Sequence, residues 1–242
     1  MSKHDEIAEV LTRDILVGQY RVGERLPSER DLASRFDANR GAVREAMKKL
    51  EQLGIAVIQP GGARVAPLSE ASLDVIGTLL ALDHVPDRQL VDQILQTISA
   101  LLQTAVISAV QRLDDEGLMT VRDLIRPIWA EGLEEDAYFE AQLNMFQGIM
   151  TASGNLPVQL IARSLLEQFH PNMEPLRGFV TPDISTHSAM ARQLDSALAD
   201  RNLTAIRTTL NEIAQFHRER MQKAFDAFEA AQQPASLEAS AS

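Results

Sequence analysis

Apolar residues recur at helical spacing in the N-terminal third of the chain and predict three short helices. Residues 4–17 favour the first helix. A second is expected from Ser28, because a serine with Asp31 three residues later is an aspartate variant of the capping box. A third is expected after Asn39, a favourable N-cap residue, and should end at Gly54. The residues expected to face inward on this third helix are Val43, Ala46, Met47 and Leu50.

The stretch after Gly54 changes from a helical to a strand pattern. Residues 55–59, "IAVIQ", are β-prone and "PGG" favours a turn. The following "ARVA" is expected to form the returning strand of a hairpin. A hairpin directly after a helix-turn-helix pattern is typical of a winged helix. Residues 1–67 are therefore expected to form a winged helix-turn-helix domain with a small β-hairpin wing.

Beyond a linker at residues 68–72, nearly every segment predicts helix. Residues 73–231 are expected to form an all-α bundle, so the fold class is mostly α. Residues 232–242 are small and polar and are expected to be disordered. Helices are expected from residue 73 to near "DHVPD" (residues 83–87), and at about residues 87–113, 116–127, 134–153, 157–169, 184–200 and 203–231.

Charge is unevenly distributed between these two parts. The formal net charge is -11, but residues 1–67 carry a balance of +1 and residues 68–242 carry -12. Because the acidic part repels polyanions, any nucleic-acid binding must be confined to the N-terminal domain.

Composition narrows the class of protein further. The chain has no cysteine, which excludes disulfides and thiolate metal sites and suits a reducing cytoplasm. No run approaches the roughly 20 apolar residues of a membrane-spanning helix, and the N-terminus lacks the pattern of a signal peptide. We therefore expect a soluble, cytoplasmic protein without membrane contact.

The third helix carries a basic stripe on the side away from its apolar face. Arg40, Arg44 and Lys48 are spaced four apart, and Gly41 leaves a gap in side-chain bulk beside Arg40. Such a stripe is either a solvated helical surface or a surface for DNA. A recognition helix reads base edges with its N-terminal residues, which is where Arg40 lies.

The segments "LPSERDLASRF" and "NRGAVREAMKKLEQLG", with the glycine-containing wing, resemble the DNA-binding domain of the GntR family of bacterial transcription regulators. The resemblance covers roughly residues 5–66. It implies binding to a double-stranded DNA operator, with repression as the default direction. In that family the arginine of the serine-glutamate-arginine motif, two arginines of the recognition helix and the wing glycines contact DNA. The matching residues are Arg30, Arg40, Arg44, Gly61 and Gly62.

Neighbouring positions complete the predicted interface. Asn39 and Gly41 stand where family members often carry Ser or Thr, so they bear on the operator sequence. Lys48 and Lys49 are expected to touch phosphate or only water, and Arg35 is expected to be solvated surface. The predicted DNA-binding set is Arg30, Asn39, Arg40, Gly41, Arg44, Lys48, Gly61 and Gly62.

The helical part resembles the effector domain of the FadR subfamily of GntR regulators. Residues 143–155, "LNMFQGIMTASGN", look like the subfamily's helix ending in A-S-G-N, and residues 186–221 look like its last helical hairpin. Residues 73–84 are similar to the fatty-acid regulators within the subfamily. The resemblance implies a homodimer that binds a pseudo-palindromic operator and responds to a small molecule.

Many subfamily members hold a divalent metal with one aspartate and three histidines. The matching positions here are Gln142, Phe146, His187 and Ile213, so one ligand of four is present. Tight metal binding needs several convergent ligands. We therefore predict neither a metal nor a cofactor.

The resemblance then favours a fatty acyl-CoA as effector, because the fatty-acid regulators hold one without a metal. A small organic or sugar acid is the alternative. The candidate pocket residues are Phe146, Met150, His187 and Phe216, each of which could also be ordinary core or helix-face packing. An enzyme in the helical domain is a remote alternative, since no nucleophile elbow, phosphate loop or H-E-x-x-H motif is present.

Overall fold

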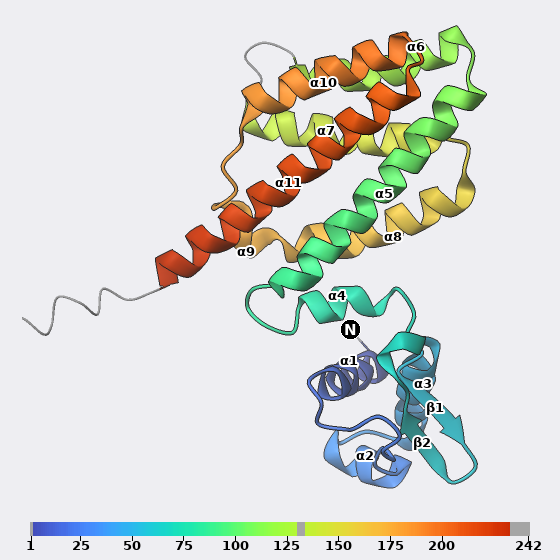
Figure 1. The fold of residues 1–242 in the computed structure, drawn as a ribbon. Coiled ribbons are helices and arrows are strands. Elements are labelled where there is room, and N and C mark those ends of the chain that lie inside the picture. The colour runs from blue at the N-terminus through green and yellow to red at the C-terminus, as the bar shows by residue number, and fades with distance from the viewer. Residues whose placement is uncertain (1, 130–133, 233–242) are drawn as a thin grey trace, which may run out of the picture. The chain divides into compact units, whose positions relative to one another are not determined.

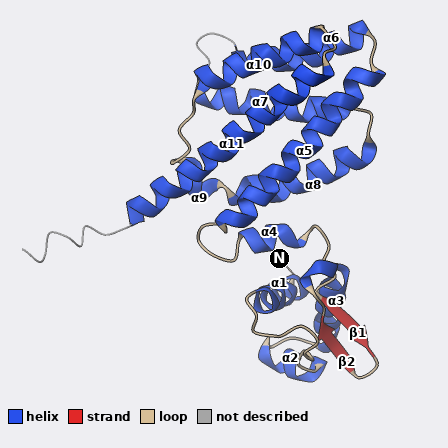
Figure 2. Cartoon of the chain, viewed as in Figure 1, coloured by secondary structure: helices blue, strands red, loops and turns tan. Residues whose placement is uncertain are grey.

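The computed structural model describes residues 2–129 and 134–232, as two compact units that divide after Pro86 (Figure 1). Most of the tail predicted to be disordered, residues 233–242, lies outside the described residues. The mostly α-helical class with one small sheet is confirmed (Figure 2).

The first unit begins with three helices, as the sequence predicted. They are α1 (Lys3–Leu16), α2 (Glu29–Arg35) and α3 (Arg40–Gln52). Ser28 caps α2, because its Oγ accepts from the backbone N–H of Asp31, and Asn39 caps α3 through the N–H of Ala42. These caps satisfy N–H groups that have no partner inside the helix. The predicted apolar face of α3 is buried: Val43, Ala46, Met47 and Leu50.

The wing follows as an antiparallel pair, β1 (Ala56–Gln59) and β2 (Gly62–Val65). Gly61 and Gly62 have φ values of +102° and +130°, which side-chain-bearing residues rarely adopt. The two glycines therefore allow the tight turn that "PGG" predicted. Figure 2 shows the hairpin as the sheet of the described chain.

The boundary between the units differs from the linker expected at residues 68–72. A 3₁₀ turn (Leu68–Glu70) and α4 (Val75–Leu80) follow the wing, and both belong to the first unit. Val75 is buried in the same apolar cluster as the winged helix. Burial against the N-terminal core therefore places α4 with that core, although its stripe resembles the effector domain.

The second unit is a helical bundle. Two features differ from the prediction: α8 runs past residue 169 through Pro171, and a short α9 forms where a loop was expected, with Pro175 in its first turn. Proline is tolerated in a first turn because its missing N–H would have no helical partner there. The elements are α5 (Arg88–Arg112), α6 (Asp115–Ile125), a 3₁₀ turn (Arg126–Trp129), α7 (Glu135–Ala152), α8 (Leu156–Asn172), α9 (Glu174–Arg177), α10 (Ile184–Ala199) and α11 (Leu203–Gln232).

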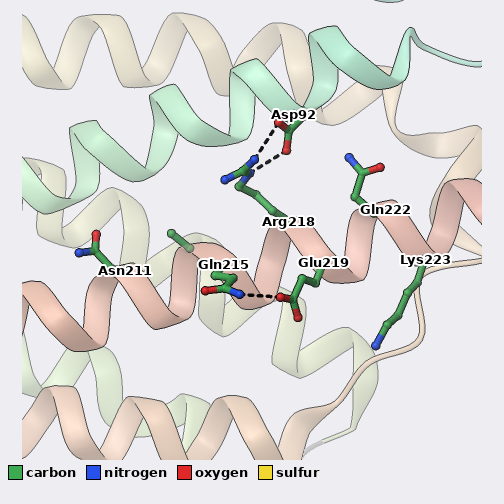
Figure 3. A pocket seen from close by; sticks show the side chains of 8 residues that line it. Asp92, Asn211, Gln215, Arg218, Glu219, Gln222 and Lys223 are labelled. Carbon is green, nitrogen blue, oxygen red and sulfur yellow. Dashed lines mark hydrogen bonds and ion pairs between the residues drawn. The ribbon is translucent and has the colours of Figure 1, made fainter.

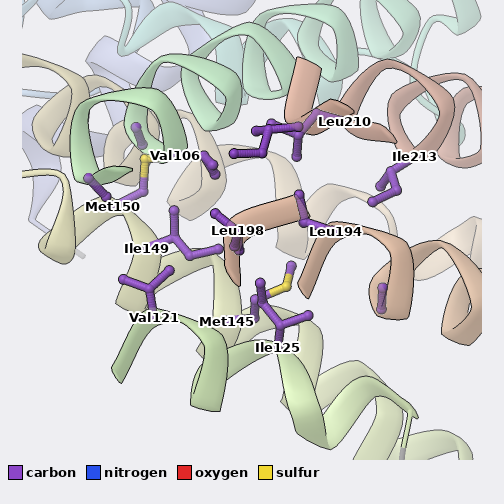
Figure 4. Packing of buried hydrophobic residues seen from close by; sticks show 14 of the residues in the cluster. Val106, Val121, Ile125, Met145, Ile149, Met150, Leu194, Leu198, Leu210 and Ile213 are labelled. Atoms are coloured by element: carbon purple, nitrogen blue, oxygen red, sulfur yellow. The ribbon is translucent and has the colours of Figure 1, made fainter. Parts of the chain in front are cut away.

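Mostly aliphatic residues from α5, α6, α7, α8, α10 and α11 fill the bundle core, part of which Figure 4 shows. Ile125 of α6, Ile149 of α7 and Leu198 of α10 have no solvent exposure. An ion pair between Arg122 Nε and Asp195 Oδ1 (2.6 Å) ties α6 to α10 at the edge of this core. The core thus fixes the helices that surround the cavity described below.

The sequence expectation about membrane spans needs one correction. Among the described helices, α5 is long and apolar enough, by length and composition, to cross a membrane. This helix packs against α7, α8 and α11 within the bundle. Its apolar residues therefore have protein partners on one side, as in the central helix of a bundle.

Candidate nucleic-acid interface and ligand cavity

The outer side of α3 presents the predicted basic stripe. Arg40, Arg44 and Lys48 are exposed, opposite the buried apolar face. The guanidinium of Arg40 has no hydrogen bond or ion pair with any residue in the described ranges. An exposed, unpaired guanidinium on the first turn of a recognition helix is free to meet base edges.

The other two cations of the stripe have acidic neighbours. Arg44 Nε lies 3.0 Å and 2.9 Å from the two carboxylate oxygens of Glu29, at the start of α2. Lys48 Nζ lies 2.9 Å from Glu45 Oε1. Both pairs are exposed, so water screens them and the cations can exchange partners at low cost.

The remaining predicted helix positions lie around the same surface. Arg30 projects from α2 with 82% of its side chain exposed, and its nearest acid is Asp31 at 3.9 Å. Gly41 is exposed, and a β-carbon there would lie 3.1 Å from Asn39 Oδ1. The structure therefore leaves the predicted residues of α2 and α3 exposed, and their DNA contacts remain predictions.

Two basic residues have structural partners that the sequence did not reveal. Arg35, expected to be solvated, donates to the buried carboxylate of Asp14 at 2.8 Å and so ties α2 to α1. Lys49, expected near phosphate or water, pairs with Asp5 of α1. Both side chains keep about two fifths of their surface exposed, at 42% and 41%, and their partners escaped sequence reasoning because they lie on α1, far away in sequence.

A cleft of about 260 Å³ lies between the start of α2, α3 and the wing. Arg25, Arg44, Lys48 and Gly62 line it together with Glu29. Arg25 was absent from the predicted set. It lies in a segment without helical or strand pattern, and only pairing with β2 brings it to the wing.

The second unit contains an apolar cavity of about 450 Å³ between α5, α7, α8 and α11. Phe146, predicted as a pocket residue, lines it with Gln142 and Ile213. Three of the four positions that matched metal ligands therefore face one cavity, although none of these three side chains is an imidazole or a carboxylate. The other aliphatic and aromatic lining residues include Leu95, Ile98, Leu102, Phe139, Leu143 and Leu210.

A cluster of rings from α7, α10 and α11 adjoins the cavity at His217. His217 lines the cavity, and its ring centroid lies 4.8 Å from that of buried His187. His187 stacks on Phe216 at 5.6 Å, and its Nδ1 is hydrogen-bonded to Tyr138 Oη at 2.7 Å. Burial lowers the pKa of His187 to about 4 and that of His217 to about 3, with Arg220 nearby adding to both shifts. Both imidazoles are therefore neutral at physiological pH.

The four predicted pocket residues therefore do not line one common pocket. Met150 is buried and lines a separate groove of about 460 Å³ between α7 and α8, which shares Phe146 and Leu166 with the cavity. His187 and Phe216 lie in the ring cluster that adjoins His217. His217 itself was missed, because a lone histidine one turn after Ile213 carries no local signal.

A polar pocket of about 770 Å³ lies between α5 and α11 (Figure 3). Two of its charged groups satisfy each other, since Arg218 Nε lies 2.7 Å from Asp92 Oδ1, and Gln215 donates to Glu219. Its residues therefore offer a ligand few unpaired groups. In residues 2–129 and 134–232, no three His, Asp or Glu side chains gather as a metal site would require.

Comparison with known proteins gives these surfaces a context. Residues 3–65 match the family described as bacterial regulatory proteins, gntR family. The HTH-type transcriptional regulator Mce2R of Mycobacterium tuberculosis is 26% identical over 181 residues, covering 73% of this chain and 74% of that protein. The fatty acid metabolism regulator protein of Klebsiella pneumoniae is 30% identical over 149 residues, covering 61% of each chain.

Two solved structures share the fold. One is Lar, which controls expression of the Listeria monocytogenes agr system, with a TM-score of 0.55 at 17% identity over 93% of this chain and 98% of that chain. The other is McbR/YncC of E. coli, with a TM-score of 0.50 at 18% identity over 93% and 99%.

A winged helix with an exposed basic stripe, joined to an all-helical domain, is typical of DNA-binding transcription regulators. Residues 3–65 are a GntR-family helix-turn-helix domain, and the chain as a whole is similar to transcription regulators that carry this domain. The resemblance found from the sequence is thereby confirmed. The named relatives are regulators and not enzymes, in agreement with the sequence interpretation.

Proposed function

We propose that the regulator responds to a fatty acyl-CoA, whose acyl chain enters the cavity between α5, α7, α8 and α11. The observation that carries this proposal is the chemistry of the lining. About 450 Å³ falls within the usual size of ligand pockets, roughly 300–1,000 Å³. The lining is mostly aliphatic and aromatic, and it includes no lysine or arginine.

Such a lining favours an uncharged guest. A buried carboxylate without a cationic partner is costly, because it loses its hydration and gains no ion pair. His217, which lines the cavity, is neutral because its pKa is lowered to about 3. An acyl thioester carries no charge at its carbonyl and so fits these surroundings better than a free acid.

One observation favours the alternative, a small organic or sugar acid. Arg220 Nη2 is buried and has no hydrogen-bond partner among the described residues, and the guanidinium lies 5.3 Å from the ring of Phe216. A carboxylate that reached this nitrogen would gain a charge-assisted hydrogen bond. Arg220 does not line the cavity, however, and its guanidinium packs over the ring of Phe216.

A thermal-shift series on the full chain tests the proposal. Acyl-CoAs of increasing chain length are compared with free coenzyme A, free fatty acids and short dicarboxylic and sugar acids. A ligand at 100 times its dissociation constant stabilises the folded state by about 2.7 kcal/mol. Stabilisation that grows with acyl length supports the proposal, whereas a response to short acids alone would favour the alternative.

For the DNA side, we propose a homodimer that binds a pseudo-palindromic operator in the cytoplasm and represses transcription, with effector binding shifting DNA affinity. The exposed residues of α3 and the wing would meet one half-site per subunit. Light scattering tests the dimer. Titration of a duplex selected from a random pool, with and without acyl-CoA, tests the coupling; equal affinities under both conditions would contradict it.

A further inference from the structure

Arg25 lies against the glycine turn of the wing. A β-carbon at Gly62 would be 2.8 Å from Arg25 Nε and 3.1 Å from its Nη2. The guanidinium therefore rests directly on the glycine backbone. The bare glycine has two roles here: it permits the positive φ, and it leaves room for the arginine.

The main chain holds Arg25 in this place. Leu26 N–H donates to the Ala63 carbonyl at 2.9 Å, and Arg25 forms an antiparallel bridge with Arg64 of β2. Two further hydrogen bonds join the residues just before Arg25 to Val65: Gly23 N–H donates to the Val65 carbonyl, and Val65 N–H donates to the Glu24 carbonyl. The segment is thus held beside β2 by an isolated bridge and its neighbouring hydrogen bonds, which fix the point from which the arginine side chain extends.

The charge of Arg25 is not neutralised. In the part of the chain that the structure describes, its guanidinium has no hydrogen bond or ion pair, whereas Arg44 pairs with Glu29 and Lys48 with Glu45. Arg25 is exposed at the rim of the cleft that Arg44 and Lys48 also line. The cleft therefore joins an unpaired cation to two weakly held ones, and this combination attracts a polyanion.

We propose that Arg25 contacts a backbone phosphate of bound DNA beside the wing. The inference rests on DNA binding by this unit. The guanidinium lies flat against the wing instead of projecting from the recognition helix, so it meets the edge of the duplex. A phosphate contact adds affinity and fixes position but carries no base preference.

The test compares Arg25→Gln with the wild type on two duplexes: one selected from a random pool by the wild-type protein, and one of mixed sequence. Losing one phosphate contact lowers the slope of log affinity against log salt by about 0.9. Affinity falls severalfold, by the same factor on both duplexes, so the ratio between them is unchanged. Arg25→Lys retains the slope, because an ammonium also neutralises a phosphate.

Arg13→Gln is the matched control. It also removes one positive charge from this unit, but from a guanidinium that donates to the Leu82 carbonyl. Its salt slope should equal that of the wild type. An unchanged slope in Arg25→Gln, an equal loss in both variants, or a changed ratio between the duplexes overturns the proposal. If the wild type binds neither duplex, DNA binding by this unit is what fails.

Discussion

Glu29 and Arg44 join the second helix of the DNA-binding unit to its recognition helix, with Arg44 Nε 3.0 Å and 2.9 Å from the two carboxylate oxygens. The pair uses Nε alone. Both terminal nitrogens of Arg44 have no partner within residues 2–129 and 134–232. Reading a guanine needs two donors from one planar fork. Glu29 can therefore orient the fork and still leave it able to donate.

Replacing Glu29 with Gln should reduce discrimination between operator and other DNA. Arg44 loses its orienting partner, so affinity for the selected duplex falls severalfold relative to the mixed-sequence duplex. Affinity for the mixed duplex rises, since one negative charge near the phosphates is removed. The exposed pair contributes less than about 1 kcal/mol to stability, so the unfolding transition hardly moves.

Anisotropy titrations on both duplexes check this prediction. Glu45→Gln is the control, because it removes the same charge beside Lys48 and leaves Arg44 paired. Equal discrimination in both variants would contradict an orienting role for Glu29.

Arg40→Ala should reduce sequence discrimination without loss of stability. An arginine fork on a guanine provides about 1–3 kcal/mol of discrimination. The side chain is exposed and has no partner among the described residues, so its removal leaves no buried group unpaired. Binding to single-base variants of the selected duplex identifies the base that Arg40 reads. A variant that still distinguishes every base would remove Arg40 from the interface.

The helices and the wing could be predicted locally, because caps, apolar spacing and turn glycines are all carried by neighbouring residues. Ser28, Asn39 and the "PGG" turn are examples. What could not be predicted depends on contacts between distant segments. The ion pair of Arg35 with Asp14 and the contact of Arg25 with Gly62 form only when separate elements pack together.

The ligand cavity was only partly predictable for the same reason. Phe146 follows from its place on the helix ending in A-S-G-N, but His217 enters the cavity from α11. The boundary between the two units at Pro86 could not be predicted either. The apolar stripe of α4 does not reveal which of the two cores will bury it.

Ala214→Phe should block the cavity. Ala214 lines it from α11, and a phenyl ring there would occupy space that an acyl chain needs. We expect the stabilisation by acyl-CoA to disappear, while DNA binding persists. Ala227→Phe, at an exposed position of the same helix, is the control. A full acyl-CoA response in Ala214→Phe would place the ligand elsewhere.

Tyr138→Phe should destabilise the bundle by about 1–3 kcal/mol, the cost of leaving a buried polar group unpaired. Tyr138 has no solvent exposure, and its hydroxyl is the hydrogen-bond partner of His187 Nδ1. Tyr20→Phe serves as the comparison, since the Tyr20 hydroxyl receives only a 3.3 Å exposed bond from Arg35. Denaturant unfolding monitored by circular dichroism measures both losses, and equal losses would show that His187 finds another partner.

The histidine pair predicts that the bundle loses stability in mild acid. The pKa values of His187 and His217 are lowered to about 4 and about 3 in the folded chain, from an ordinary value of 6.5. Between these values the unfolded chain binds protons that the folded chain does not. Stability is therefore complete above about pH 6.5 and falls as the pH decreases toward 4, by up to about 1.4 kcal/mol per pH unit for each histidine.

Denaturant unfolding at about pH 7 and about pH 5 isolates this effect, because carboxylates with a lowered pKa, such as Asp92, protonate at still lower pH. The double variant His187→Gln, His217→Gln should have a flatter dependence on pH, whatever its absolute stability. His84→Gln, at an exposed position, should keep the wild-type dependence. Equal wild-type stability at the two pH values would mean that the imidazoles take up protons inside the fold, which requires water or an acidic partner to reach the ring cluster.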